Sequence, residues 1–416
     1  MRSFSIQSFG CRTNQAEAFQ WAGRLQQHGF VLENSYYKSD IVIVNTCTLT
    51  QRADADARNF IRKVSRQNPK ARIIVTGCYA ERDPMRFRKD PKVWKVFLNK
   101  EKDLLPREVM DHFGSRKPVP YIPFRSRAPV KIQDGCDFKC TFCIIPEVRG
   151  PSRSCSQEKI ITRVKDLVAK GFKEIVLTGI HVCLYGRDLT PKSSLKELVS
   201  ELVSVRGLES IRLSSLDPRF LNKKFIDFIT SQEKVCPHFH FSLQHTSDRI
   251  IREMGRNISS ERYSSLLEYT REKSPDASLG ADIIVGFPGE SKQDFDQLYA
   301  FLKKSPLSYF HVFSYSPRPG TAAADQKRVP SKTEKKRSAA LRELSREKNL
   351  RFRQRFENKV LDAVVIKKKD RKLHLLTPNY LKVVIPDGSF QKRSRVKVKI
   401  KEVGPKEARG ISVLRL

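Results

Sequence analysis

The sequence lacks long apolar runs, and its acidic residues are few beside its basic ones. No segment of the 416 residues reaches the roughly 18 consecutive apolar residues that a membrane-spanning helix needs. Residues 1–6 also lack the apolar segment of a secretory signal, so we expect a cytoplasmic protein with no membrane association. Internal repeats and low-complexity tracts are missing, and 39% hydrophobic residues are typical of a globular chain. Membrane-spanning, collagen-like and wholly disordered proteins are therefore excluded.

The shortage of acidic residues leaves a large positive charge. The chain has 45 Asp and Glu residues against 80 Lys and Arg residues, a formal net charge of +35. The excess is concentrated at one end, since residues 327–416 contain 28 basic and 9 acidic residues. A basic module of this kind is typical of proteins that bind nucleic acid or an anionic surface. A solvated, lysine-rich surface is the plain alternative, and clustering in one terminal module favours the polyanion.

The first hundred residues alternate between strands and helices. Strands are predicted at 4–6, 40–45 and 72–76, and helices at 15–28 and 52–66. Continuous Val and Ile runs separated by helices indicate a parallel sheet with βαβ crossovers. Residues 81–129 lose this periodicity and contain seven prolines, so we interpret them as the end of the domain followed by a linker.

A second, more regular alternation follows. Strands are predicted at 130–133, 174–178, 210–214, 238–243, 278–285 and 309–313, separated by helices with apolar residues at helical spacing. Six β/α units are fewer than the eight that close a TIM barrel. We therefore expect an open, partial barrel whose working face lies at the carboxyl ends of its strands.

The basic end of the chain predicts a charged helix at 332–357 and then a small β-barrel. Its strands are predicted at 360–366, 373–376, 381–385, 395–403 and 410–414. The fold class is thus α/β, divided into an N-terminal parallel βαβ domain (1–100), a linker (101–129), a partial (β/α)6 barrel (130–330), a connecting helix (331–357) and a β-barrel (358–416). Lys397, Lys399 and Lys401 alternate along one predicted strand, where they would contact phosphates.

Three of the nine cysteines lie just beyond predicted parallel strands. Cys11, Cys47 and Cys78 follow residues 4–6, 40–45 and 72–76, and we call them the strand-end set. Because the carboxyl ends of parallel strands share one edge of a sheet, these thiols can converge on one ligand. Three thiolates suit an iron–sulfur cluster or zinc, with a fourth position that is open or filled from elsewhere. Three separately buried cysteines are the alternative.

Three further cysteines form a local C-x3-C-x2-C motif directly after the first strand of the partial barrel. Cys136, Cys140 and Cys143, which we call the loop set, can wrap three corners of a [4Fe–4S] cube and leave one iron open. A structural zinc site would normally need a fourth Cys or His ligand. Cys155, Cys183 and Cys236 have no such spacing, and we interpret them as structural or incidental.

The loop set at the start of an incomplete barrel resembles the radical S-adenosylmethionine (SAM) superfamily. With the strand-end set before it and a basic β-barrel (a TRAM module) after it, the chain resembles the methylthiotransferase branch over nearly its whole length. The segments 10–15, 45–50, 131–136, 144–150 and 177–181 are most similar to the enzymes that modify threonylcarbamoyladenosine in tRNA. Two other branch members modify isopentenyladenosine in tRNA and an aspartate of a ribosomal protein.

The resemblance implies two [4Fe–4S] clusters, an auxiliary one on the strand-end set and a SAM-reducing one on the loop set. It implies SAM contacts at Gly179, Ser215 and Gln244, although strand-end capping is an alternative for Ser215. It also implies methylthiolation at C2 of the adenosine at tRNA position 37, with the anticodon stem-loop as partner and flavodoxin or ferredoxin as reductant. We expect a monomer. An iron–sulfur RNA-binding regulator without turnover is an alternative from another class.

Overall fold

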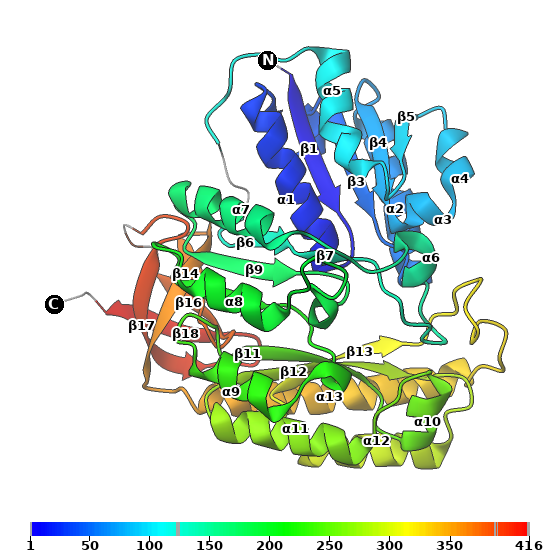
Figure 1. Ribbon diagram of the computed structural model, residues 1–416, viewed down its shortest axis with the longest axis vertical. Helices are drawn as coiled ribbons and strands as arrows, with labels where there is room; N and C mark the ends of the chain where they lie inside the picture. The colour runs from blue at the N-terminus through cyan, green and yellow to red at the C-terminus, as the bar shows by residue number, and fades with distance from the viewer. Residues whose placement is uncertain (1, 122–124, 387, 389, 414–416) are drawn as a thin grey trace.

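The computed structural model describes all residues except 1, 122–124, 387, 389 and 414–416. Figure 1 shows the N-terminal sheet at the top, the second unit below it, and the C-terminal barrel to one side of that unit. None of the helices in the described part of the chain combines the length and the apolar character of a membrane span.

The N-terminal unit is a five-stranded sheet in the order β2-β1-β3-β4-β5, with every pair parallel. Its strands are β1 (Ser3–Ser8), β2 (Val31–Leu32), β3 (Ile41–Thr46), β4 (Arg72–Gly77) and β5 (Val93–Phe97). Its helices are α1 (Arg12–Gln27), α2 (Gln51–Gln67), α3 (Cys78–Arg82), α4 (Pro84–Arg88) and α5 (Leu105–Phe113). The parallel βαβ arrangement predicted for this part of the chain is confirmed.

The continuous apolar run of β3 follows from burial on both faces of the sheet. Ile41 and Ile43 pack in a core that includes residues of α1 and α5. Val42 and Val44 point the other way, into a core that includes residues of α2 and α3. A strand covered on both sides has no polar face, as is usual for a parallel sheet.

The second unit is a partial barrel of six parallel strands. Its main strands are β6 (Ala128–Lys131), β9 (Glu174–Thr178), β10 (Ser210–Leu213), β11 (His238–Gln244), β12 (Ser278–Val285) and β13 (Tyr309–Ser314). They form two three-stranded sheets, and isolated parallel bridges from Ile211 to Val235 and from Leu216 to Phe241 join the sheets near β10 and β11. The predicted partial barrel is confirmed.

Helices cover the outside of this barrel, while polar side chains line its inside. The covering helices are α7 (Gln157–Ala169), α8 (Leu195–Val203), α9 (Lys223–Ser231), α10 (Asp248–Glu253), α11 (Ser260–Lys273) and α12 (Lys292–Lys304). On β11, Phe239 and Phe241 pack in the large core beneath the helices. His238 and His240 alternate with them and therefore point into the barrel. A short hairpin of β7 (Gln133–Asp134) and β8 (Arg153–Ser154) and the helix α6 (Ile145–Arg149) stand at the carboxyl end of β6.

The long helix α13 (Ser331–Gln354) connects the partial barrel to a closed β-barrel. It lies along β13, where the Ser345 hydroxyl accepts a hydrogen bond from Phe310 N at 2.9 Å. The closed barrel has the strand order β14-β15-β16-β18-β17 and an apolar core of its own. Its strands are β14 (Val360–Lys369), β15 (Lys372–Leu376), β16 (Lys382–Pro386), β17 (Arg395–Val403) and β18 (Ala408–Val413). The predicted C-terminal β-barrel is confirmed, and the end of its predicted last strand, at 414, lies outside the described residues.

Candidate active site between two sets of cysteines

The strand-end set meets at the carboxyl edge of the N-terminal sheet. Cys11 immediately precedes α1, Cys47 follows β3, and Cys78 begins α3 directly after β4. The backbone at Gly10 passes so close to Cys47 that a Cβ there would lie 2.4 Å from its Sγ. Burial raises the pKa of Cys47 to about 12, and the negative charges of the neighbouring Cys11 and Cys78 thiolates add to this. A cation shared by the three sulfurs would remove that repulsion, so the donor set fits a metal cluster.

The loop set lies between β7 and α6. Cys136 N donates to Gly150 O at 3.1 Å and Cys143 N donates to Cys140 O at 3.0 Å, which folds the loop tightly. Burial raises the pKa of Cys143 to about 12, and charge on Cys140 and Cys136 raises it further. The same reasoning applies here: the three thiols fit a shared metal cluster better than three isolated thiols.

Gln133 anchors the start of this loop, and Gly179 makes room for the anchor. The Gln133 side-chain amide donates to Asp134 O at 2.9 Å and to Gly135 O at 2.8 Å. Its oxygen accepts from His181 N at 2.8 Å. A Cβ at Gly179 would lie 2.9 Å from that oxygen, so a larger residue would displace the anchor.

A central pocket of about 270 Å³ is lined by Cys143 of the loop set and by residues that follow Cys47 of the strand-end set in the sequence. From the barrel it is lined by Phe142, Cys143, Ile144, Gln244, Asp282, Ile284, Phe313, Ser314, Tyr315, Ser316 and Arg318. From the N-terminal unit it is lined by Leu49 and Thr50, which follow Cys47 in sequence. Leu49 is 43% exposed and Phe313 is 44% exposed, unusual values for large apolar side chains. Exposed apolar faces in a pocket of this kind suit a flat ring such as a nucleobase.

The three residues predicted to contact SAM fall in different places. Gln244 lines the central pocket, at a positive φ of 73° where β11 shifts register against β12. Ser215 and Gly179 lie at neighbouring strand ends but are not among the pocket-lining residues. The Ser214 and Ser215 hydroxyls are buried and have no hydrogen-bond partner among the described residues. All three SAM contacts stay predictions.

Arg149 of α6 joins the two units beside the strand-end set. Its Nε donates to Cys78 Sγ at 3.1 Å, and its Nη1 donates to Asp134 at 2.7 Å and to Glu17 of α1 at 3.0 Å. Burial raises the pKa of Glu17, but the positive charges around it, Arg149 first among them, outweigh burial and hold that pKa well below its usual range. The guanidinium thus places a fixed positive charge against a sulfur of the strand-end set.

An apolar cluster contains cysteines of both sets. Ile144, Ile145 and Val148 of the segment around α6 pack with Cys78, and Cys136 and Cys143 pack against the same cluster. Apolar side chains of this kind keep water away from the sulfurs, which suits chemistry that water would quench.

Arg318 also lines the central pocket, and nothing in the sequence indicates this role. Its Nη2 donates to Asp54 of α2 at 2.8 Å. Asp54 also pairs with Arg82 at 3.0 Å and accepts a hydrogen bond from the Thr48 hydroxyl at 2.7 Å. The arginine is 3% exposed, and its Nε and Nη1 have no hydrogen-bond partner within the described part of the chain. The pairing joins residues 264 positions apart, so no local pattern indicates it.

Two histidines and an aspartate also point into the barrel. His240 Nε2 lies 3.0 Å and His311 Nδ1 lies 3.3 Å from Asp282 Oδ1. Burial raises the pKa of Asp282, but hydrogen bonds from both rings outweigh burial and keep that pKa low. In the sequence, polar residues at alternate positions of neighbouring strands give only a weak indication of such a His–Asp–His group.

The other three cysteines lie apart from both sets. Cys236 is buried, Cys155 packs against the large barrel core, and Cys183 Sγ accepts a hydrogen bond from Asp217 N at 3.3 Å. These surroundings agree with a structural role.

Two family models match the chain. Residues 3–99 match "Uncharacterized protein family UPF0004", and residues 130–302 match the "Radical SAM superfamily". The second match implies SAM and a [4Fe–4S] cluster. The solved radical SAM methyltransferase TsrM from Kitasatospora setae superposes with a TM-score of 0.55 at 13% identity, covering 78% of this chain and 74% of that one, which shows a shared fold.

Curated relatives cover almost the whole chain. The threonylcarbamoyladenosine tRNA methylthiotransferase MtaB of Aquifex aeolicus is 37% identical over 91% of this chain and 95% of its own length. The MtaB of Bacillus subtilis is 32% identical over 97% of this chain and 95% of its own length. The tRNA-2-methylthio-N(6)-dimethylallyladenosine synthase of Desulforamulus reducens is 32% identical over 87% of this chain and 84% of its own length. With both family models and both sets of cysteines in place, the chain belongs to the radical SAM methylthiotransferase family.

Proposed function

We propose that this enzyme attaches a methylthio group to C2 of N6-threonylcarbamoyladenosine at position 37 of tRNA. The observation that carries the proposal is the central pocket, which touches Cys143 of the loop set and the segment that follows Cys47 of the strand-end set. Relatives with threonylcarbamoyladenosine in their names, at 37% and 32% identity over most of the chain, support this substrate.

The cofactor sites follow from the two sets of cysteines. The loop set would hold a [4Fe–4S] cluster with one iron open to SAM, and the strand-end set would hold a second [4Fe–4S] cluster. When bound, these groups supply the radical and the sulfur chemistry that an unactivated C2–H bond needs. Gly179, Ser215 and Gln244 are the proposed SAM contacts, and Ser215 brings a buried hydroxyl without a partner among the described residues.

The protein's own residues orient the substrate and protect it. Leu49 and Phe313 offer apolar faces for the adenine ring, and the apolar cluster around Ile144 keeps water away from the cysteines that pack in it. Lys397 and its neighbours on β17 lie on the outside of the closed barrel, where they would contact tRNA phosphates. We assign residues 1–100 to the auxiliary cluster, 130–330 to the radical SAM barrel and 358–416 to RNA binding, with 101–129 as a linker and 331–357 as a connecting helix.

Product analysis tests the proposal. The protein is reconstituted anaerobically with iron and sulfide and incubated with SAM, dithionite and tRNA that carries threonylcarbamoyladenosine. Mass spectrometry of the digested tRNA should find the 2-methylthio nucleoside, together with 5′-deoxyadenosine. Absence of that nucleoside from fully loaded enzyme would reject the proposal.

Isopentenyladenosine is the second candidate substrate, because a relative at 32% identity is named for the dimethylallyl nucleoside. A parallel reaction on tRNA that carries isopentenyladenosine separates the two candidates. If product forms only on that tRNA, isopentenyladenosine is the substrate and the threonylcarbamoyladenosine proposal is wrong. SAM cleavage without a methylthiolated tRNA would point to the ribosomal-protein aspartate, and redox-dependent tRNA binding without SAM cleavage would point to a regulator.

A flavodoxin or ferredoxin is the proposed physiological reductant, and the enzyme is proposed to act as a monomer. Replacing dithionite with a reduced flavodoxin should support product formation, and light scattering should give the mass of one chain.

A further inference from the structure

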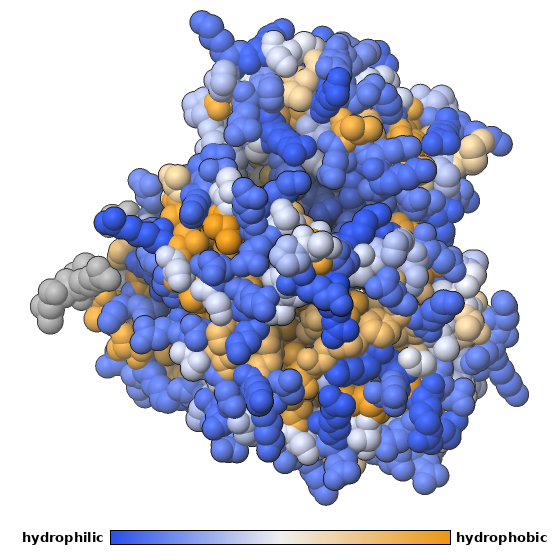
Figure 2. All heavy atoms as spheres, viewed as in Figure 1, coloured by the Kyte–Doolittle hydropathy of each residue, from blue (hydrophilic) through white to orange (hydrophobic). Residues whose placement is uncertain are grey.

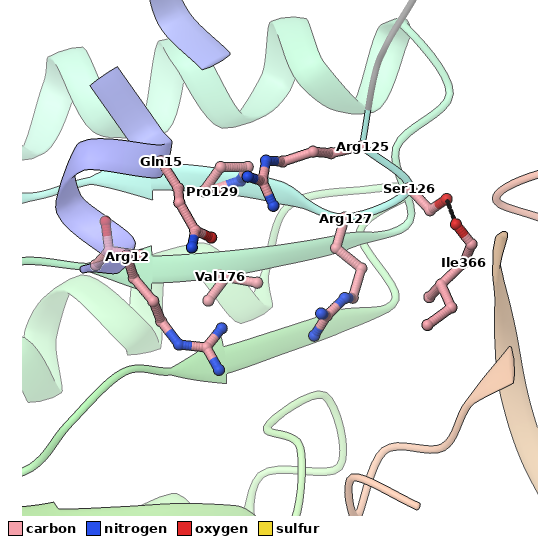
Figure 3. Close-up of a pocket in the computed structure, with 9 residues that line it drawn as sticks. Arg12, Gln15, Arg125, Ser126, Arg127, Pro129, Val176 and Ile366 are labelled. Carbon is pink, nitrogen blue, oxygen red and sulfur yellow. Dashed lines mark hydrogen bonds between the residues drawn. The ribbon is translucent and has the colours of Figure 1, made fainter. Parts of the chain in front are cut away.

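A second cavity, the arginine pocket, lies where the three units of the chain meet. It measures about 180 Å³ and is lined by Arg12, Gln15, Arg125, Ser126, Arg127, Pro129, Val176, Thr178 and Ile366. Figure 3 shows the side chains of Arg12, Arg125 and Arg127 gathered around it, with Arg12 and Gln15 reaching in from α1. Ser126 fixes the closed barrel to this wall, since its hydroxyl donates to Ile366 O at 3.0 Å.

Arg12 and Arg127 have little negative charge beside them among the described residues. Arg127 Nη1 lies 3.5 Å from Glu174 Oε1, but Arg212 Nε pairs with the same oxygen at the shorter distance of 2.8 Å. Arg12 donates instead to the Tyr380 hydroxyl at 2.9 Å. Burial lowers the pKa of Arg127 and of Arg125, and neighbouring arginines lower both further, although Glu174 offsets part of the effect at Arg127. Guanidinium groups held together under burial favour a bound anion that offsets their repulsion.

The position of Arg12 relates this pocket to the reaction. Arg12 directly follows Cys11, and consecutive Cα atoms are about 3.8 Å apart. From there its side chain extends to Tyr380 of the closed barrel. C2 and N6 flank N1 on one edge of the adenine ring. When C2 faces the cysteines, a substituent on N6 therefore leaves the ring from that same edge, and Arg12 is next to one of those cysteines in the chain.

We propose that the arginine pocket binds the carboxylate of the threonylcarbamoyl group, with Arg12 and Arg127 as the residues that determine substrate specificity. This inference rests on the proposed function. A carboxylate matches the fork of a guanidinium, and Gln15, Ser126 and Thr178 supply neutral polar atoms for the rest of the group. An isopentenyl substituent carries no charge and would leave the arginines without their anion, so the pocket would reject it.

Binding of short RNAs tests this inference. Three anticodon stem-loops would be prepared that differ only at position 37: one with the threonylcarbamoyl group, one with its carboxylate converted to a methyl amide, and one with isopentenyl. Fluorescence anisotropy with the reconstituted enzyme should give a Kd at least about 10-fold lower for the carboxylate than for the amide, the scale of a charge-assisted hydrogen bond. Arg12→Gln and Arg127→Gln should each bring this ratio close to one, while Arg12→Lys should keep most of it.

The matched control is Lys397→Gln on β17. It should weaken all three RNAs by the same factor, because its proposed contact is to phosphate. If the two arginine variants also weaken all three RNAs equally, the pocket binds a backbone phosphate and the inference is wrong. A wild-type enzyme that binds the carboxylate and amide RNAs equally would also overturn it. A failure of the proposed function would be seen in a separate measurement. The wild-type enzyme would then form no methylthio nucleoside when it reacts with the RNA that carries the threonylcarbamoyl group.

Discussion

Arg149 is a single side chain on which the geometry of the site depends. It is fully buried at the junction of the two units and donates to Cys78, Glu17 and Asp134 at once. Lys102 and Lys131 surround the same two carboxylates. A buried ionic network of this kind holds its shape only while every member is present, because each unpaired charge is costly there.

Arg149→Met is therefore expected to destabilise the protein by about 3 kcal/mol, since it leaves buried carboxylates with one cation fewer. Anaerobic denaturation followed by the fluorescence of the buried Trp21 measures the change. Arg107→Met is the control, because Arg107 is 78% exposed and its pair with Asp111 should contribute little. Equal midpoints for the two variants would contradict the role of Arg149.

Removing one cysteine from each set should give different defects. Cys140→Ala should abolish both 5′-deoxyadenosine and methylthiolated product. Cys47→Ala should retain SAM cleavage and lose the methylthio product, with about half of the iron. Cys155→Ala should behave as wild type. Iron analysis and chromatography of the products measure all three, and a fully active Cys47→Ala enzyme would remove the strand-end set from the reaction.

Both sets of cysteines could be predicted because each has a local sequence signal. The strand-end set follows predicted strands, and the loop set has a short, regular spacing. It did not reveal Arg149 or Arg318 as contacts between the two units. Arg149 meets Glu17, 132 positions away, and Arg318 meets Asp54, 264 positions away. Pairings over such separations leave no periodicity or spacing to detect.

At the scale of elements, regular alternation makes the barrel strands predictable. These strands have four to eight residues, and the predicted bounds of all six lie within two residues of the observed ones. For 81–129 the sequence predicts the end of the domain and a linker without placing any helix or strand, and the structure has α4, β5 and α5 there. These elements have five to nine residues, and α4 and α5 each have a proline in the first turn. An apolar pattern over so few residues is too short to identify a helix or a strand.

β17 combines an apolar face with a basic one. Val396, Val398 and Ile400 fill the core of the closed barrel, while the lysines between them face outward. Lys397→Gln should lower tRNA affinity and reduce the slope of log Kd against log salt concentration by about 1, because one phosphate contact is lost. Filter binding over a range of salt concentrations measures this slope. An unchanged slope would place the tRNA on another surface.

At the scale of the whole molecule, Phe19 connects the N-terminal unit to the core of the partial barrel. Phe19 of α1 is buried among residues of the barrel and packs edge-on against Phe172, with ring centroids 5.6 Å apart. The closed barrel has a separate core. The surface in Figure 2 is mostly hydrophilic, with smaller apolar areas between the charged side chains.

Phe19→Ala should therefore cost about 3–5 kcal/mol and loosen both units, because Phe19 belongs to α1 of one unit and is buried in the core of the other. Hydrogen exchange should show lost protection in β3 and in β9 together. Leu375→Ala, in the separate core, should loosen the closed barrel and leave β3 and β9 protected. Loss of protection in β3 alone after Phe19→Ala would mean that the two units unfold independently.

The contact between Arg149 and Cys78 also bears on the order in which the enzyme matures. The loop set lies within eight consecutive residues and can take up metal as soon as that segment folds. The strand-end set needs three strand ends and a guanidinium that arrives with the other unit. We therefore expect the loop set to be filled first and the strand-end set only after the two units have docked, so a chain arrested during biogenesis should carry the first cluster without the second.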